Sequence, residues 1–344
     1  MSKDLAPDWI LQQTLDIQKK ANVAWLNTKP EIDDGGLTLT VLGCGTMGTA
    51  ILAGIMEYLS ETDKDLLTGA TRSETVQETK DESAPRKLPT KFNACVRSRE
   101  SADRIRKQLG KFNARLTVRE NDSLPAVKQA DVVLLACEPD AVRSILSAEG
   151  VREALAGKLL ISVCGGITEK QMHDTLYGES SEDIQKCTVV RAMPNVAAAI
   201  RESMTVIATS ETPLSEETER LVTWIFTRIG SVRRVPSSKM DICTALCGSG
   251  PAFAALLVES MAAGAISMGL NRDDAYVMAA QAMRGSAGLL LEGEHPALLR
   301  DKISTPGGGT ISGLLALEEG GLRSTVAKAV RESARVVGQM GSEK

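Results

Sequence analysis

The sequence has few of the residues on which metal and nucleophilic chemistry most often depend. Only two histidines occur among its 344 residues, and no two cysteines are separated by just two positions. Zinc sites and histidine-based catalytic triads therefore have little to be built from. The seven cysteines are an odd number, and most lie within apolar runs. We interpret them as reduced core residues, and we expect no metal site.

Aromatic residues and excess charge are also scarce. Aromatics make up 3% of the chain and the net charge at pH 7 is −4, whereas nucleic-acid surfaces combine basic residues with stacking aromatics. No continuous apolar run reaches the roughly 18 residues that cross a membrane. The N-terminal segment has no apolar core of the kind that marks a signal peptide. We therefore expect a cytoplasmic protein that binds neither nucleic acid nor membranes.

Short apolar segments alternate with helical patterns through the first two thirds of the chain. The segments predict strands at residues 37–42, 91–96, 114–118, 131–137, 158–163, 188–192 and 204–209. Apolar strands with helices between them form parallel sheets that are covered on both faces. The predicted fold class is α/β, with a Rossmann-type, mostly parallel sheet followed by an all-helical domain.

Changes in composition divide the chain into three parts. Residues 1–36 carry a helical spacing of apolar residues, so we expect a helical N-terminal extension. Residues 37–236 form the predicted dinucleotide-binding domain, in which the polar residues 60–90 are expected to be a mobile insertion. Residues 237–344 show only helical patterns and form the predicted substrate and dimerisation domain. Long apolar helices of this kind are often covered by a second copy of the chain.

A glycine motif, GCGTMG at residues 43–48, follows the first predicted strand and opens a helix. In a dinucleotide site Gly43 would permit the tight turn, Gly45 would let the backbone approach the pyrophosphate, and Gly48 would let the helix pack on the strand. Thr46 and Met47 belong to the same expected contact with the cofactor. The alternative is a glycine-rich turn that binds nothing.

In such folds, residues at the end of the second strand bind the ribose of the cofactor. Here the chain carries Arg97, Ser98 and Arg99, followed by Glu100. Guanidinium and hydroxyl groups donate hydrogen bonds to a 2′-phosphate, so we expect NADPH. NADH is the alternative, with Glu100 as the residue that binds the sugar.

Loops after later strands line the cofactor crevice as well. Ala136 and Pro139 follow one of these strands, and Asn195 follows another. We assign all three to cofactor binding. Asn195 is also a candidate for substrate binding, and its alternative role is to form a turn with the preceding proline.

The most informative segment is TPGGGT at residues 305–310, which leads directly into a helical pattern. The first N–H groups of a helix bind anions, so Gly308, Gly309 and Thr310, with the Thr305 hydroxyl, can hold a small carboxylate. The Thr310 hydroxyl is the candidate catalytic group beside it. Alternatively, Thr310 only caps the helix and Thr305 only forms a turn.

Together these motifs resemble the Δ1-pyrroline-5-carboxylate reductase family. The resemblance covers about residues 37–342 and is most specific at residues 293–320. It implies hydride transfer from NAD(P)H to the C=N carbon of a five-membered cyclic imino acid, the final step of proline biosynthesis. It also implies a Rossmann domain and a helical domain through which two subunits interlock, with further assembly in several members. Thr310 would contact the ring nitrogen.

Several positions depart from the family pattern. Glu138 stands where similar proteins usually have lysine, and a carboxylate near a polyanionic cofactor is unfavourable. Val196 and Ala197 replace a common Thr-Pro, Cys247 replaces a serine or threonine, and Phe253 replaces a tyrosine. These changes bear on the tuning of cofactor and substrate binding more than on the reaction.

Other functions remain open. A reductase of the six-membered piperideine-2-carboxylate differs by one methylene, and Glu138 favours a non-catalytic NADPH-binding relative. A 3-hydroxyacid dehydrogenase is disfavoured, because residues 245–281 contain no lysine or histidine that could act as the base. Within the same run Ser249 is expected to lie at a helix break and not to be a nucleophile. His295 is expected to start a helix.

Overall fold

The structure is a computed structural model that describes residues 35–68, 84–178, 185–209 and 213–342. The predicted N-terminal helix lies outside the described residues, as do residues 69–83 of the predicted insertion. The beginning of that insertion was predicted wrongly. Helix α2 (Thr46–Thr68) continues through residues 60–68, which were assigned to the insertion.

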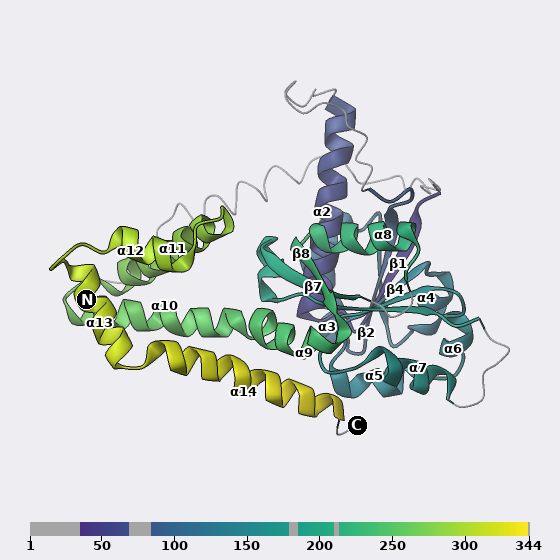
Figure 1. Cartoon of the computed structure of the whole chain (residues 1–344). Helices are drawn as coiled ribbons and strands as arrows, with labels where there is room; N and C mark the ends of the chain where they lie inside the picture. Colours follow the sequence, from purple (N-terminus) through teal and green to yellow (C-terminus); the bar gives the residue numbers. More distant parts are fainter. Residues whose placement is uncertain (1–34, 69–83, 179–184, 210–212, 343–344) are drawn as a thin grey trace. The chain divides into compact units, whose positions relative to one another are not determined.

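Eight strands form one sheet in the order β3-β2-β1-β4-β5-β6-β7-β8 (Figure 1). They are β1 (Leu37–Leu42), β2 (Pro89–Val96), β3 (Leu116–Glu120), β4 (Val132–Leu135), β5 (Leu159–Ser162), β6 (Thr188–Met193), β7 (Ser203–Thr209) and β8 (Gly230–Pro236). All neighbours pair in parallel except β6 and β7, which confirms the mostly parallel sheet. Strand β8 was not predicted, because Arg233 and Arg234 interrupt its apolar residues.

Helices cover both faces of this sheet (Figure 1). They are α2, α3 (Arg99–Leu109), α4 (Leu124–Gln129), α5 (Pro139–Leu146), α6 (Val151–Ala154), α7 (Glu169–Tyr177) and α8 (Glu216–Thr227), with the 3-10 turns η1 (Gly110–Phe112) and η2 (Val196–Ile200). Side chains of α2, α3 and α8 share one buried cluster with Leu39 and Val41 of β1. Side chains of α4 to α7 form a second cluster with Leu42. Alternation along β1 therefore supplies both cores.

The start of β8 depends on glycine. Gly230 has a φ of +145°, and a Cβ atom there would lie 2.1 Å from the Ser203 carbonyl oxygen of β7. We expect Gly230→Ala to lower the free energy of unfolding by about 2 kcal/mol or more, because backbone strain and overlap add. Urea unfolding measures this. Gly110→Ala is the matched control, since nothing lies within 4 Å of a Cβ atom at Gly110. Equal stability of the two variants would contradict the prediction.

After β8 every described element is helical. These elements are η3 (Ser237–Lys239), α9 (Met240–Cys243), the π-helical turn η4 (Thr244–Gly248), α10 (Gly250–Ser267), α11 (Arg272–Leu291), α12 (Pro296–Ile303), α13 (Gly309–Glu319) and α14 (Leu322–Ser342). The predicted helix break near Ser249 is confirmed by the π-helical turn. Helix α10 then begins with Pro251 in its first turn, where a missing N–H leaves no helical bond unmade.

The first part of this helical region is strongly apolar. The stretch Ser237–Ser267 contains an 18-residue window with a mean hydropathy of 1.5, and it is long and apolar enough to cross a membrane by length and composition. The expectation based on continuous apolar runs missed this stretch, because polar residues such as Asp241 and Glu259 interrupt it. Several large apolar side chains of the region are exposed in the single chain, among them Leu246, Leu256, Met261, Val277, Leu291 and Leu315.

Candidate active site

The turn from β1 into α2 is held between the ends of two other strands. Gly43 has a φ of +75°, and its N–H and that of Cys44 donate to the Cys95 carbonyl at 3.1 and 3.0 Å. A Cβ atom on Gly43 would lie 2.5 Å from the Cα of Cys137. The turn therefore packs backbone against backbone, and no side chain fits there.

The other two glycines of the motif have different surroundings. A Cβ atom on Gly48 would lie 2.8 Å from Cγ1 of Val41, so this glycine lets α2 pack on β1. A Cβ atom on Gly45 would find its nearest atom, the Gly43 carbonyl oxygen, 4.0 Å away. Gly45 directly precedes Thr46 and Met47, which begin α2 and whose N–H groups have no helical acceptors. This geometry fits a dinucleotide pyrophosphate.

The end of β2 carries three exposed polar residues, as the sequence indicates. Ser98 begins α3, and its hydroxyl oxygen accepts from the Ser101 N–H at 3.2 Å. Arg97 and Arg99 are exposed on either side of it. Neither arginine forms an ion pair with any residue that the structure describes. Both guanidinium groups are thus available to an anion at this strand end.

The end of β4 adjoins the glycine turn. The Ala136 N–H donates to the Leu42 carbonyl at 2.8 Å, and a Cβ atom on Gly48 would lie 3.5 Å from the Cβ of Ala136. Glu138 is exposed and precedes Pro139, the first residue of α5. A carboxylate at a helix N-terminus is favourable, which offsets part of its repulsion of a phosphate nearby.

Asn195 is buried, with 9% of its surface exposed, and both ends of its side chain are bonded within the chain. The amide oxygen accepts from the Ala197 N–H at 3.0 Å, and Nδ2 donates to the Cys247 carbonyl at 3.0 Å. In a regular α-helix that carbonyl would accept from residue 251, but Pro251 has no N–H. Asn195 thus joins the loop after β6 to η4. Its contact with substrate or cofactor stays a prediction.

Residues 305–308 form the turn before α13, and Gly309 and Thr310 are the first two residues of the helix. The Gly308 N–H donates to the Thr305 carbonyl at 3.0 Å, and a Cβ atom on Gly308 would lie 2.4 Å from the Thr305 hydroxyl oxygen. Gly308 is the residue that precedes the helix, so the alternative of Thr310 as its capping residue is wrong. Thr310 is exposed, and its hydroxyl has no hydrogen bond among the described residues. It is free to bind a ligand.

The structure assembles the predicted site as two parts. The glycine turn and the ends of β2 and β4 lie together, whereas residues 305–310 form a separate group at α13. None of the hydrogen bonds found among the described residues joins residues 305–310 to the sheet. Within one chain, the hydrogen bonds of the described residues therefore do not hold the two parts of the predicted site together.

The remaining candidates have structural partners. Ser249 lies 3.0 Å, oxygen to oxygen, from the Ser333 hydroxyl of α14. Nδ1 of His295 accepts from the Ala297 N–H at 3.3 Å at the start of α12, which confirms its predicted structural place. His173 stacks on Tyr177 within α7. Across the described ranges, no three His, Cys, Asp or Glu side chains are grouped so that they could hold a metal ion.

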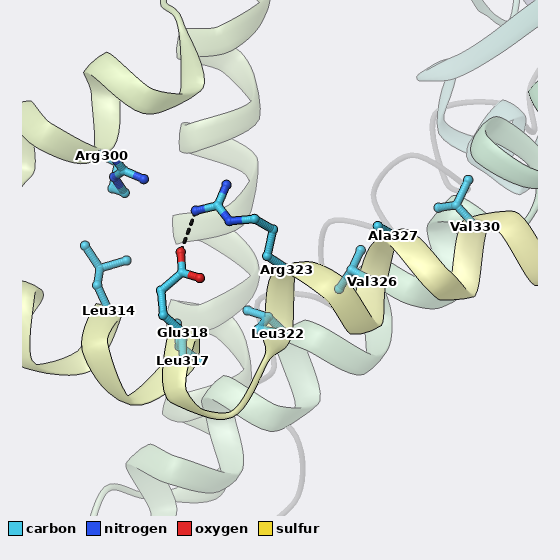
Figure 2. A pocket seen from close by; sticks show the side chains of 9 residues that line it. All are labelled: Arg300, Leu314, Leu317, Glu318, Leu322, Arg323, Val326, Ala327 and Val330. Atoms are coloured by element: carbon cyan, nitrogen blue, oxygen red, sulfur yellow. Dashed lines mark hydrogen bonds and ion pairs between the residues drawn. The ribbon is translucent and has the colours of Figure 1, made fainter.

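A groove of about 450 Å³ lies between α12, α13 and α14 (Figure 2). It is lined by Arg300, Leu314, Leu317, Glu318, Leu322, Arg323, Val326, Ala327 and Val330. Glu318 forms an ion pair with Arg323 at one side of it. The groove includes neither Thr305 nor Thr310, so it is not the predicted substrate site.

Comparison with known proteins identifies the family. A family model described as pyrroline-5-carboxylate reductase dimerisation matches residues 237–340, and one described as NADP oxidoreductase, coenzyme F420-dependent, matches residues 38–166. A pyrroline-5-carboxylate reductase of Lophium arboricola is 52% identical over 308 residues, covering 89% of this chain and 93% of the relative. The chain belongs to the pyrroline-5-carboxylate reductase family. The reductase of Neurospora crassa is 45% identical, with the same coverage of both chains.

Solved structures agree with this fold. Pyrroline carboxylate reductase of Plasmodium falciparum, crystallised with NADP, superposes with a TM-score of 0.68 at 24% identity, covering 89% of this chain and 98% of that one. The reductase of Streptococcus pyogenes gives the same score and identity, covering 88% and 99%. The Rossmann-type sheet followed by a helical dimerisation domain, as predicted from the sequence, is thus the architecture of the family.

Proposed function

We propose that this chain reduces L-Δ1-pyrroline-5-carboxylate to L-proline with NADPH. The observation that carries the proposal is the pair of built sites: an open glycine turn at the head of α2, and a free hydroxyl beside bare N–H groups at the head of α13. The first suits a pyrophosphate and the second suits a small carboxylate. Relatives of the chain at 52% and 45% identity carry the name of this reductase.

In the proposed substrate complex the N–H groups of Gly309 and Thr310 hold the carboxylate, together with the Thr305 hydroxyl. The Gly308 N–H already donates to the Thr305 carbonyl, so Gly308 contributes its lack of a side chain beside the Thr305 hydroxyl and not a donor. The Thr310 hydroxyl contacts the ring nitrogen and fixes which face of the ring is presented. Bound NADPH supplies the hydride for the C=N carbon. Because the protonated imine is already electrophilic, the residues need only hold it in place, and orientation of this kind lowers a barrier by several kcal/mol.

The cofactor site is proposed at Gly43, Gly45, Thr46, Met47 and Gly48, with Ala136, Pro139 and Asn195 completing the crevice. The 2′-phosphate is assigned to Arg97, Ser98 and Arg99.

We expect Arg97→Ala to reduce the preference for NADPH over NADH by about tenfold, since a charge-assisted hydrogen bond is lost. The ratio of kcat/KM for the two cofactors measures this. Lys107→Ala, an exposed charge removed from the end of α3, is the control. A preference unchanged by Arg97→Ala would contradict the assignment.

One assay tests the reaction. The purified chain is mixed with NADPH and either pyrroline-5-carboxylate or piperideine-2-carboxylate, and absorbance of the reduced nicotinamide is followed. We expect the higher kcat/KM with the five-membered ring. A higher value with the six-membered ring would assign the alternative substrate. No turnover with either ring, by protein that binds NADPH, would identify a non-catalytic relative.

The dimerisation domain supports a homodimer formed through the helical region. We propose that this domain begins at residue 237, directly after β8, where the family model begins. The exposed apolar residues of α10 and α11 are then covered by the second copy, not by lipid. The dimer is also where residues 305–310 would meet a dinucleotide crevice. Light scattering without detergent tests this: a monomer would contradict the proposal, and larger particles would indicate further assembly.

We also propose a cytoplasmic location. The dimer would account for the apolar stretch Ser237–Ser267 without a membrane. Cell fractionation tests the location. Recovery of the enzyme in the membrane fraction would contradict it.

A further inference from the structure

Cysteines stand at the carboxyl ends of four neighbouring strands, beside the dinucleotide turn. Cys44 follows β1, Cys95 lies near the end of β2, Cys137 follows β4 and Cys164 follows β5. All four are free thiols. The proposed reduction of the imino acid uses none of these four thiols.

Two of these thiols are in contact. The sulfur atoms of Cys137 and Cys164 are 3.9 Å apart. Strands β4 and β5 are parallel, and Leu135 is the register partner of Ser162, so each cysteine lies two residues beyond a paired position. The ladder extends past the strands, because the Val163 N–H donates to the Leu135 carbonyl at 2.9 Å. Neighbouring strands lie about 4.8 Å apart, within the range that a disulfide bridges.

The other two thiols of the group are inert by comparison. Cys44 and Cys95 are buried in the packed turn, and burial raises the pKa of the Cys44 thiol to about 11 and that of Cys95 to about 12. Cys137 is only partly buried. Its hydrogen bond to the Cys164 sulfur lowers the pKa of the Cys164 thiol. The same hydrogen bond raises the pKa of the Cys137 thiol. The contact between the two sulfur atoms, and not the exposure of either thiol, therefore distinguishes this pair.

The pair is coupled directly to the proposed cofactor site. The Cα and Cβ of Cys137 are the atoms nearest to Gly43, at 2.5 Å from a Cβ atom built there. The Cys137 backbone therefore packs directly against the turn at Gly43. Closing a disulfide requires the two sulfur atoms to approach from 3.9 Å to about 2.05 Å, which displaces the side chain of the residue against which the turn packs.

We propose that Cys137 and Cys164 form a reversible disulfide that weakens dinucleotide binding. The oxidant is a peroxide. The Cys164 thiolate attacks one oxygen of hydrogen peroxide, the O–O bond breaks, and the sulfur becomes a sulfenic acid, while the hydroxide that leaves takes up the proton lost by the thiol and forms the first water. The Cys137 sulfur then displaces the hydroxyl group, forming the S–S bond and releasing the second water. Two thiols are oxidised and one peroxide is reduced to two waters, and a dithiol such as dithiothreitol reverses the change.

This inference rests on the proposed function for its cofactor. The test uses the full chain, reduced or treated with hydrogen peroxide, and has two readouts. Peptide mapping after thiol alkylation identifies the cross-link, and fluorescence titration gives the Kd for NADPH. We expect a peptide joining Cys137 to Cys164, and a Kd raised by about tenfold or more that dithiothreitol restores. NADPH added beforehand should slow the oxidation.

Two variants make the test specific. Cys164→Ser should bind NADPH as the reduced parent does and should keep that Kd after peroxide. Cys243→Ser, which removes a half-buried thiol from α9, should respond to peroxide like the parent. Absence of the cross-link, or a Kd unchanged by it, would overturn the redox inference. Reduced protein that fails to bind NADPH would instead overturn the proposed function.

Discussion

Replacing Thr310 by alanine is expected to lower kcat/KM for the imino acid by about tenfold or more, or about 1.4 kcal/mol of transition-state stabilisation. The hydroxyl is exposed and unbonded among the described residues, and it lies in the first turn of α13. Its removal should therefore leave the fold intact. Steady-state kinetics with pyrroline-5-carboxylate and thermal unfolding of the same preparation measure the two effects separately.

Two neighbouring substitutions serve as controls for Thr310. Thr310→Ser keeps a hydroxyl at the same place and should retain most of the activity. Ser312→Ala removes a hydroxyl that already donates to the Gly308 carbonyl at 3.2 Å, so kcat/KM should change little. Parental kinetics in Thr310→Ala would remove this residue from the mechanism. Equal losses in all three variants would point to a general disturbance of the helix start.

Replacing Gly45 by alanine is expected to raise the Kd for NADPH by about tenfold or more, because the methyl group would occupy the space assigned to the pyrophosphate. The same methyl group meets no protein atom closer than 4.0 Å. Without cofactor, the free energy of unfolding should change by less than about 1 kcal/mol, the scale of a helix-capping effect. Fluorescence titration and urea unfolding test the two halves of this prediction.

Replacing Gly43 by alanine should lower the stability of the fold itself. In Gly43→Ala the methyl group would overlap the Cys137 backbone, and the φ of +75° disfavours any side chain. We expect lost stability in the absence of cofactor. This contrast separates a glycine needed for folding from one needed for binding. If Gly45→Ala keeps the parental Kd, the turn is not the pyrophosphate site.

The sheet was predictable because its strands are buried on both faces and so consist of continuous apolar runs. Strand β8 was missed because it is partly exposed and carries Arg233 and Arg234. Residues 60–68 were assigned to the insertion because their polar sequence has no clear apolar periodicity to mark them as part of helix α2. The glycine turn, by contrast, was predicted in detail, since positive φ and close backbone contacts leave glycine as the residue that fits.

Within the candidate site, only contacts between neighbours in the sequence could be predicted. The role of Gly308 at the start of α13 depends on where the helix begins, which a run of glycines does not reveal. The contact between Asn195 and Cys247 joins residues 52 positions apart, and the pairing of Cys137 with Cys164 depends on strand register. Long-range contacts of this kind require the tertiary structure.

The hydrogen bond from Asn195 to the Cys247 carbonyl links the residue types at positions 195 and 251. Pro251 leaves a carbonyl without its helical donor, and the asparagine amide supplies the missing hydrogen from another part of the fold. Substitution of Asn195 alone would leave the partly buried Cys247 carbonyl without a hydrogen-bond donor, which would lower the free energy of unfolding by about 1–3 kcal/mol. Losing the proline alone would introduce a second donor that competes for the same oxygen. Positions 195 and 251 should therefore covary, so that a lineage changes both or neither.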